Sequence, residues 1–262
     1  MRFHIFEFED LKWFPNTIRE GGTDYLRYFL NAGDFYKPVI PIISQTLDQI
    51  GENKIIDLCS GGGGAIEQIH KGLRENSSQP VAITLTDKFP NNNAYAHLKE
   101  KYHGQIDFKD FSVDATDVPK DLKGLRTMFS AIHHFEPETV QAVLKNAVDN
   151  HAAICLFDGG DKNIFTILGI ILFHPIAFIL CTPFFKPFKF SRLFFTYIIP
   201  LIPLTTVWDG CVSILRLYSP DELLSLAKET GHNNYVWKAG KVKNKVGMHI
   251  TYLVGYPGKG NN

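Results

Sequence analysis

Short runs of aliphatic and β-branched residues alternate with amphipathic stretches over residues 54–258. Such runs are typical of buried strands, whereas apolar residues that recur roughly every three to four positions are typical of helices. The predicted strands of this region cover residues 54–58, 81–86, 106–113, 125–131 and 152–157. Because helical patterns separate them, their order predicts βαβ units around a mostly parallel sheet, which is an α/β fold.

The helices and the C-terminal segments carry local signals of their own. One helix is predicted over residues 91–102, and another carries an apolar stripe formed by Val140, Val143, Leu144, Ala147 and Val148. Residues 219–222 form a capping box with proline at the first helical position, which opens a further helix. The last two strands, over residues 235–242 and 248–255, are predicted to form an antiparallel hairpin.

A long apolar segment, residues 164–204, separates the predicted fifth strand from the last helix. Most of it is Ile, Leu or Phe, and its charged residues are all basic: Lys186, Lys189 and Arg192. Residues 164–185 are about long enough to cross a bilayer, but His174 and Pro175 interrupt the run near its middle. We therefore expect a re-entrant or interfacial hairpin whose basic tip lies at the headgroup surface of a membrane.

A second interpretation of residues 164–204 stays open. A buried helical subdomain that covers an active site, or an interface between two subunits, would hold the same apolar surface. The abundance of phenylalanine in this one insertion exceeds what a single sheet face needs, and this favours contact with a membrane.

The charge balance disfavours nucleic-acid partners. The chain of 262 residues carries 27 Lys or Arg and 27 Asp or Glu, so its formal net charge is +0 and its pI is about 7.1. Proteins that bind nucleic acids usually carry a clustered basic surface. The length allows one large hydrophobic core, to which a small subdomain can be added.

Cysteine spacing and the N-terminal residues indicate a reducing compartment. The four cysteines are widely spaced and form no CxxC pair, which argues against a zinc site and against a disulfide framework. Glu7 lies where a signal peptide needs an uninterrupted apolar stretch. We expect a cytoplasmic protein without a bound metal, either free or peripheral to or embedded in the inner face of a membrane.

These patterns divide the chain into segments with different roles. Residues 1–50 are aromatic-rich and predict a helical lid, and residues 51–160 form a cofactor-binding core. Residues 161–210 form the apolar insertion or cap, and residues 211–262 supply the helix and hairpin that complete the core. The pattern leaves the oligomeric state open.

A run of glycines, residues 61–64, follows the first predicted strand directly. Glycines let the backbone approach a ligand closely, and the helix after them offers unpaired N–H groups. Asp87 ends the second strand roughly 20 residues later, where an acidic side chain in this topology accepts hydrogen bonds from ribose hydroxyls. The combination predicts a site for a nucleotide-like cofactor.

Other interpretations of the glycine run are weaker. It could be a tight turn, with Asp87 as a helix cap. A dinucleotide-binding fold needs the pattern GxGxxG, but Ile66 occupies the position of the third glycine counted from Gly61. No lysine follows in the arrangement of a P-loop. These departures disfavour NAD, FAD and ATP.

The same residues resemble the class I (Rossmann-like) S-adenosylmethionine-dependent methyltransferase family. The family's first motif, an acidic residue followed by a glycine-rich turn, is similar to Asp-Leu-Cys-Ser-Gly-Gly-Gly at residues 57–63, although Cys59 departs from the commoner glycine. Asp87 resembles the family's ribose-binding acid. Asp114 with Ala115 resembles the motif that contacts the adenine amino group, and the segment from Ser130 to Phe135 resembles the one that lines the methyl-donor pocket.

The resemblance covers residues 54–157, with the motifs in the family's order. It implies a Rossmann-like, seven-stranded, mostly parallel sheet with an antiparallel terminal hairpin and an apolar helical insertion. It implies S-adenosyl-L-methionine as the cofactor, bound by Asp57, Cys59, Ser60, Gly61, Gly63, Asp87, Lys88, Asp114, Ala115 and Ser130. The apolar insertion lies where this family often builds its substrate-binding cap.

Candidate catalytic residues follow from the reaction that the resemblance implies. Methyl transfer is an in-line displacement at a sulfonium carbon, so the protein mainly positions two reactants and a base is optional. His133 and His134 are the candidates, because they follow a strand at its carboxyl end, where ligands collect in open α/β sheets. The alternative for either histidine is a structural imidazole that caps the next helix.

Further polar residues flank the predicted core. Trp208, Asp209 and Arg216 follow the apolar insertion and are candidate substrate-binding residues, although Asp209 with Gly210 also fits an ordinary turn. The N-terminal residues that could close over the cofactor, with an arginine facing its carboxylate, are Trp13, Arg19, Asp24, Tyr25 and Arg27. Packing within a lid is the alternative for most of them.

The sequence therefore predicts an S-adenosylmethionine-dependent methyltransferase for a small or lipid-like acceptor, with no nucleic-acid partner. A membrane-associated protein that binds the cofactor without turnover is the alternative. A nicotinamide-dependent oxidoreductase is disfavoured by Ile66. The acceptor molecule, its reacting atom and the use of a general base stay open.

Overall fold

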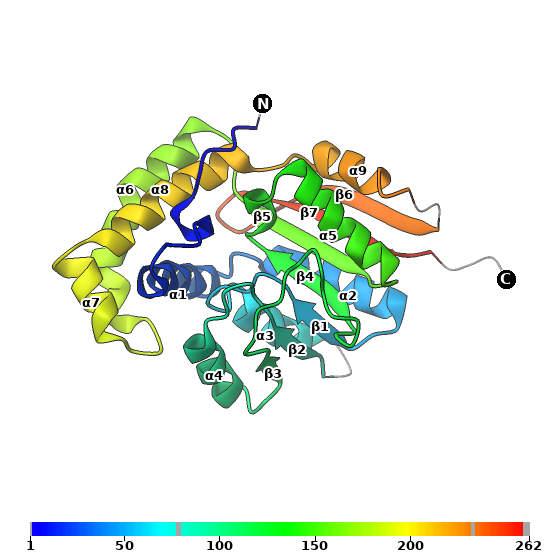
Figure 1. The fold of residues 1–262 in the computed structure, drawn as a ribbon, viewed down its shortest axis with the longest axis horizontal. Helices are drawn as coiled ribbons and strands as arrows, with labels where there is room; N and C mark the ends of the chain where they lie inside the picture. Colours follow the sequence, from blue (N-terminus) through cyan, green and yellow to red (C-terminus); the bar gives the residue numbers. More distant parts are fainter. Residues whose placement is uncertain (1, 77–79, 232–233, 259–262) are drawn as a thin grey trace.

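The computed structural model describes residues 2–76, 80–231 and 234–258, and these contain a seven-stranded sheet with the order β3-β2-β1-β4-β5-β7-β6 (Figure 1). The strands are β1 (Lys54–Asp57), β2 (Ala82–Leu85), β3 (Ile106–Phe108), β4 (Leu125–Phe129), β5 (Ile154–Gly159), β6 (Tyr235–Lys243) and β7 (His249–Pro257). Strands β1 to β5 pair in parallel, whereas β7 is antiparallel to both β5 and β6. This confirms the predicted α/β, Rossmann-like sheet with an antiparallel terminal hairpin.

Helices cover both faces of the sheet. Successive residues of a strand point to opposite faces, so consecutive apolar residues such as Ile55 and Ile56 need cover on both. The core helices are α2 (Ile40–Ile50), α3 (Ile66–Asn76), α4 (Asn92–Lys101), α5 (Pro137–Asp149) and α9 (Pro220–Lys228). Ile55 packs into the cluster that includes buried residues of α2, α3 and α4, whereas its neighbour Ile56 packs with those of α5 and α9. The predicted capping box is present at Ser219 and Glu222, where it starts α9.

The third and fourth strands are shorter than predicted. β3 ends at Phe108 rather than at residue 113, because the chain leaves this edge strand and the backbone N–H of Val113 donates to the carbonyl oxygen of Asp87 at 2.9 Å. β4 ends at Phe129, because Ser130 adopts a left-handed conformation with a φ of 50° that a strand does not accommodate. The predicted ends at residues 113 and 131 were therefore wrong.

The apolar insertion is helical. It contains α6 (Ile164–Cys181), the short 3₁₀ turn η4 (Thr182–Phe184), α7 (Phe190–Tyr197) and α8 (Leu201–Arg216). α6 and α8 lie side by side and α7 joins them, so the insertion folds as a helical hairpin (Figure 1). α6 runs on through His174 and Pro175, so the predicted interruption at these residues was wrong.

The basic residues at the tip of the hairpin are mostly engaged by α1 (Asn16–Ala32). Lys189 Nζ pairs with Glu20 Oε2 at 2.8 Å, and the buried Arg192 pairs with Asp24 Oδ2 at 2.5 Å. Lys186 is exposed. The expectation that all three cations face a headgroup surface was wrong, because two of them stabilise the contact between α1 and the insertion.

Residues Ile164–Phe184 form a helical stretch of 21 residues that is long and apolar enough to cross a membrane. Length and composition alone give this result, and core helices of soluble proteins meet the same criterion. In this helical stretch, however, only 6% of the most apolar 18 residues are buried. The exposed side chains of α6 include Phe165, Leu172, Phe173, Ile176, Ile179 and Leu180.

Two predicted segment boundaries also shift. α2 packs in the main core through Ile43 and Leu47, so it is part of the core rather than of a lid. α8 continues past residue 210 to Arg216, so the insertion ends later than predicted. Residues 2–14 form an N-terminal strap, which crosses α8 in Figure 1. The strap contains one short 3₁₀ turn, η1 (Phe8–Asp10).

Candidate active site

The glycine turn between β1 and α3 is tied to the sheet by Asp57. Asp57 is buried, and its carboxylate accepts hydrogen bonds from Ser60 Oγ at 2.6 Å and from Thr127 Oγ1 at 2.7 Å. Burial raises the pKa of Asp57 to about 7, although the two hydroxyl groups oppose this shift. Asp57 therefore fixes the shape of the turn through Ser60 and links the turn to β4 through Thr127.

Asp87 follows β2 and faces the same turn. Its Oδ2 accepts a hydrogen bond from the backbone N–H of Gly61 at 2.8 Å, and its Oδ1 accepts one from the N–H of Phe89 at 2.7 Å. Burial raises the pKa of this carboxyl above its ordinary value. The side chain is only half-buried, so its carboxylate is held at the edge of the sheet with lone pairs left for a ligand.

Asp114 and Lys88 form a pair beside Asp87. Lys88 Nζ lies 2.8 Å from Asp114 Oδ2, and Asp114 Oδ1 accepts a hydrogen bond from the N–H of Thr116 at 2.9 Å. Burial opposes ionisation, but the bonds from Lys88 and Thr116 lower the pKa of Asp114 to about 2. Ala115 is buried between these polar residues and the core. The structure thus brings the predicted cofactor-binding residues after β2 and β3 to one edge.

Cys59 occupies a position that favours glycine. Its φ is 55°, in the left-handed region, and its side chain packs against the core cluster that contains Leu58 and Ala115. Burial raises the pKa of its thiol well above the ordinary value. A thiol that stays protonated is a poor nucleophile, so the partly buried Cys59 contributes its backbone and its small size rather than its chemistry.

α1 packs directly onto the glycine turn. A Cβ atom at Gly62 would lie 2.9 Å from the carbonyl oxygen of Thr23, and one at Gly63 would lie 3.3 Å from Arg27 Cδ. Glycine is therefore needed at Gly62 for the helix to approach this closely. Two buried atoms of α1 at this contact, Asp24 Oδ1 and Arg27 Nε, have no hydrogen-bond partner among the described residues.

A cavity of about 740 Å³ lies at the carboxyl ends of β4 and β5, where α1, α6 and α8 line it. Its lining is mostly apolar and includes Phe14, Tyr25, Phe29, Phe165, Ile170 and Phe173. The segment after β4 supplies the polar lining groups Ser130, His133 and His134, and α6 and α8 add others such as His174 and Asp209. Volumes of this order are typical of sites for small molecules.

His133 is held by Asp158. His133 lies on the 3₁₀ turn η3 (Ile132–His134) after β4, and its Nδ1 is 3.0 Å from Asp158 Oδ1 on β5. Both side chains are buried. Because Asp158 occupies Nδ1, Nε2 is the nitrogen that remains to act on a ligand. Asp158 was not predicted, although it also lies near the end of a strand.

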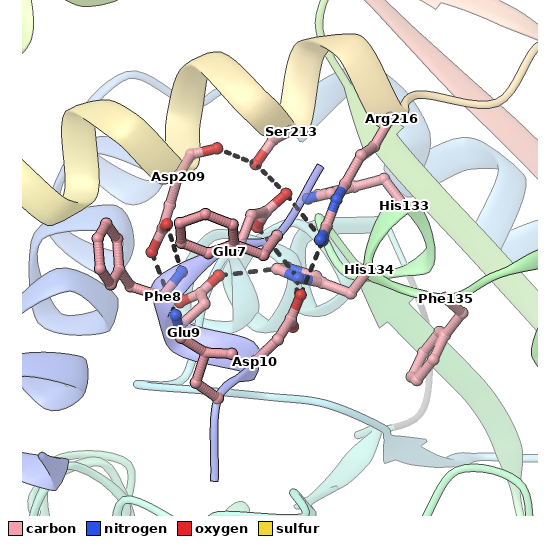
Figure 2. A network of polar contacts seen from close by, with 12 residues as sticks. Glu7, Phe8, Glu9, Asp10, His133, His134, Phe135, Asp209, Ser213 and Arg216 are labelled. Atoms are coloured by element: carbon pink, nitrogen blue, oxygen red, sulfur yellow. Dashed lines mark hydrogen bonds and ion pairs between the residues drawn. The ribbon is translucent and has the colours of Figure 1, made fainter. Parts of the chain in front are cut away.

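His134 is surrounded by carboxylates of the N-terminal strap (Figure 2). Its Nδ1 lies 2.9 Å from Asp10 Oδ1 and 3.1 Å from Glu7 Oε2, and its Nε2 lies 3.2 Å from Glu9 Oε1. Burial opposes protonation, but Glu7, Asp10 and Glu9 raise the pKa of His134 well above its ordinary value. An imidazolium cannot accept a proton, so His134 lacks the form that a general base needs.

The three predicted substrate-binding residues contact the strap. Trp208 Nε1 donates to the carbonyl oxygen of Phe6 at 3.1 Å, and the Asp209 carboxylate accepts from the N–H of Phe8 at 2.7 Å. Arg216 pairs with two acidic residues of the strap (Figure 2). Burial raises the pKa of Asp209 to about 8. Of the three, Asp209 also lines the cavity, so the others anchor the strap rather than face a ligand.

The N-terminal candidates have different surroundings. Trp13 is exposed, whereas Tyr25 lines the cavity and stacks on Phe178 with ring centroids 3.9 Å apart. Arg19 donates to the strap carbonyl of Leu11 at 2.8 Å. Asp24 and Arg27 are the two that reach the glycine turn.

No protein-family model matches the chain, and no curated protein matches its sequence. Among solved structures, the methyltransferase domain of bacterial CtHen1-C is similar at 14% identity and a TM-score of 0.49, over 84% of this chain and 97% of that chain. Human N-acetylserotonin methyltransferase is similar at 12% identity and a TM-score of 0.49, over 90% and 56%. An O-methyltransferase family protein from Burkholderia thailandensis is similar at 13% identity and a TM-score of 0.48, over 87% and 57%.

The chain therefore spans little more than half the length of the last two proteins. The strand order and register, rather than these distant matches, establish the fold of the chain.

Proposed function

We propose that the chain is an S-adenosyl-L-methionine-dependent methyltransferase that acts on a small or lipid-like, mostly apolar acceptor. The observation that carries this proposal is the meeting of two features at one edge of the sheet. One is the glycine turn with Asp87 and Asp114 beside it, and the other is the apolar cavity, which begins at Ser130 after β4. Ligands of open α/β sheets collect at this edge.

The residues at the turn fit the proposed methyl donor. Asp87 would accept hydrogen bonds from its ribose hydroxyls, and Asp114 would lie at its adenine end, as the resemblance of their motifs implies. Asp24 Oδ1 lies 3.6 Å from the Arg27 guanidinium, but neither it nor Arg27 Nε forms a hydrogen bond among the described residues. Both atoms are buried at the glycine turn, where the ammonium and carboxylate of an amino acid would complete their bonding. When bound, S-adenosylmethionine supplies a sulfonium methyl carbon and keeps the electron pair of the broken S–C bond on sulfur.

The cavity supports an apolar acceptor. Aromatic side chains of α1 and α6 form much of its wall, and such surfaces bind apolar molecules by excluding water. Ser130, His133 and His134 are polar lining groups that follow β4, so an acceptor with its reacting atom at this end of the cavity would meet them. The acceptor atom gains the methyl group and releases its proton, and we assign His133 Nε2 to accept this proton.

Removing His133 is expected to slow turnover without affecting donor binding. The His133→Ala variant should transfer methyl groups about 10²- to 10⁴-fold more slowly, the usual effect of losing a group that handles the proton. The measurement uses methyl-labelled S-adenosylmethionine with vesicles made from a total lipid extract and counts label in the organic phase. His97→Ala on α4 is the matched control and should retain full activity. Equal rates for the two variants would remove His133 from the catalytic site.

The insertion supports contact with a membrane, from which a lipid-like acceptor would enter the cavity. α6 contributes to the cavity wall through Phe165 and Phe173, and it exposes apolar side chains along nearly its whole length. A helix that binds one protein partner has a single apolar stripe, whereas one surrounded by lipid is apolar all round.

A vesicle flotation assay tests the membrane contact. The triple variant Leu172→Gln, Ile176→Gln, Ile179→Gln changes exposed residues of α6 that do not line the cavity. We expect its affinity for phosphatidylcholine–phosphatidylglycerol vesicles to fall at least about 10-fold. Three apolar side chains that become buried in a membrane contribute several kcal/mol to the free energy of binding. Val246→Gln, at an exposed site in the β6–β7 turn, should bind like the unmodified protein. Unchanged flotation of the triple variant would contradict the contact.

A further inference from the structure

Three side chains with metal-binding atoms meet beside the cavity. Glu7 comes from the N-terminal strap, and His133 and His134 come from η3 (Figure 2). One ligand atom from each lies within 4.8 Å of the others. Glu7 is separated from the histidines by more than 120 residues in sequence, so only the fold brings them together.

Glu7 is anchored through one carboxylate oxygen and presents the other. Oε1 lies 3.1 Å from an Arg216 guanidinium nitrogen and accepts a hydrogen bond from Ser213 Oγ at 3.3 Å. Oε2 lies 3.1 Å from His134 Nδ1, but it is buried and no hydrogen bond to it is formed among the described residues. Glu7 as a whole is 0% exposed. A buried carboxylate oxygen without a hydrogen bond is costly unless a cation binds it.

His133 is anchored in the same manner. The Asp158 carboxylate binds its Nδ1 at 3.0 Å, which orients the ring and leaves Nε2 for another partner. Histidines that bind metals almost always use one ring nitrogen for the metal and give the other to a carboxylate or carbonyl. The contact between His134 Nε2 and Glu9 at 3.2 Å repeats this arrangement, and Nδ1 is turned toward Glu7 Oε2 at 3.1 Å and Asp10 Oδ1 at 2.9 Å, so Asp10 would exchange this contact for one with the ion.

The charges around the three residues also favour a cation. Glu7, Glu9 and Asp10 bring three carboxylates to His134, and Arg216 pairs with two of them. A divalent ion would take the place of the proton on His134 and offset the two negative charges that remain once both imidazoles are neutral. His133 and His134 line the cavity, so an ion at this point would be reached from it.

We propose that Glu7, His133 and His134 bind a divalent first-row transition metal, such as Zn²⁺, Mn²⁺ or Fe²⁺. Two imidazoles and one carboxylate suit these ions better than Mg²⁺ or Ca²⁺, which prefer oxygen ligands. Because the protein supplies three ligands, further coordination positions on the ion are open to a ligand from the cavity. This inference differs from the sequence-based expectation that the chain holds no metal.

The site narrows the acceptor class, a step that rests on the proposed function. A bound divalent ion lowers the pKa of a coordinated hydroxyl group, so an acceptor with a hydroxyl on an apolar body would be activated there. Its oxygen would form the bond to the methyl carbon, and its proton would pass to water, since the ion would occupy the Nε2 of His133 that otherwise accepts the proton. The acceptor class is then a phenol, enol or lipid alcohol rather than a thioether or a ring nitrogen.

Metal binding is tested on the full chain, purified without a histidine tag and treated with chelator. Zn²⁺ titration by calorimetry should show one site, and Co²⁺ should give visible absorption bands that Mg²⁺ does not displace. Glu7→Gln and His133→Ala should weaken Zn²⁺ binding at least about 100-fold, and Asp158→Asn about 10- to 100-fold, as for the carboxylates that orient metal-binding histidines. His174→Ala is the control, since His174 lines the cavity but is not part of the cluster.

Circular dichroism and the affinity for S-adenosylmethionine show whether each variant is folded. The inference is overturned if the unmodified chain binds no Zn²⁺ stoichiometrically, or if Glu7→Gln and His133→Ala bind it as tightly as His174→Ala does. Donor binding without metal binding would overturn only the metal site and leave His133 itself as the proton acceptor. Metal binding without donor binding would support the metal site and remove the proposed function.

Discussion

The Asp87→Ala variant is expected to bind S-adenosylmethionine at least about 100-fold more weakly than the unmodified chain. Asp87 presents a carboxylate at the end of β2, and hydrogen bonds to a charged group contribute about 1.5–3 kcal/mol each. Loss of two such bonds to ribose hydroxyls corresponds to a change of this size. Asp87 also accepts from the N–H of Gly61, so its removal loosens the glycine turn as well. Titration calorimetry gives the affinities directly.

The controls separate ligand binding from damage to the turn. Asp87→Asn keeps one acceptor oxygen for the turn but removes the charge, and we expect an intermediate loss of affinity. Asp107→Ala removes an acid at the exposed edge of the same part of the sheet, where it pairs with Lys99. It should bind the donor normally. An unchanged affinity for Asp87→Ala would contradict its assignment to the ribose.

The Asp24→Ala variant is expected to lose about 3–5 kcal/mol of unfolding free energy, the usual cost of leaving a buried charge unpaired. Asp24 is 0% exposed, and its Oδ2 lies 2.5 Å from a nitrogen of Arg192, which is itself buried. The pair joins α1 to the insertion, so its loss would also weaken the wall of the cavity. Urea denaturation, followed by circular dichroism, measures the change.

A neighbouring pair provides the control for this prediction. Glu20 binds Lys189 at 2.8 Å from a partly exposed position on α1. Partly exposed ion pairs contribute about 1 kcal/mol or less, so Glu20→Ala should change the unfolding free energy by no more than that. A loss below about 1 kcal/mol for Asp24→Ala would mean that the pair does not hold the insertion in place.

Much of the fold could be predicted because its signals are local. Alternation of apolar runs with helical patterns located the strands, and the carboxyl ends of parallel strands meet at one edge by construction. The glycine turn and Asp87 were placed together for this reason, and Asp114 was added because its motif resembles that of the methyltransferase family. The strand ends were less accurate, since a left-handed residue such as Ser130 has no signature in the hydrophobic pattern.

The rest of the site depends on contacts between distant residues. The strap has no periodic pattern, and it is held by bonds such as that between the N–H of Phe8 and Asp209, which are 201 residues apart. Glu7 therefore gave no signal as a partner of His133 and His134. Similarly, the cations of the insertion were assigned to a membrane because nothing in the sequence pairs Arg192 with Asp24. Long-range polar pairing was the information that the sequence pattern lacked.

The central claim is that the edge of the sheet at the glycine turn binds S-adenosylmethionine. Titration of the purified 262-residue chain by calorimetry tests it most directly, with S-adenosylmethionine and S-adenosylhomocysteine as ligands and NADH and ATP as comparisons. We predict one site for each of the two sulfur compounds, with dissociation constants on the order of micromolar, and no site for NADH or ATP. Binding of NADH, or an absence of heat with both sulfur compounds, would contradict the methyltransferase account while leaving the fold unchanged.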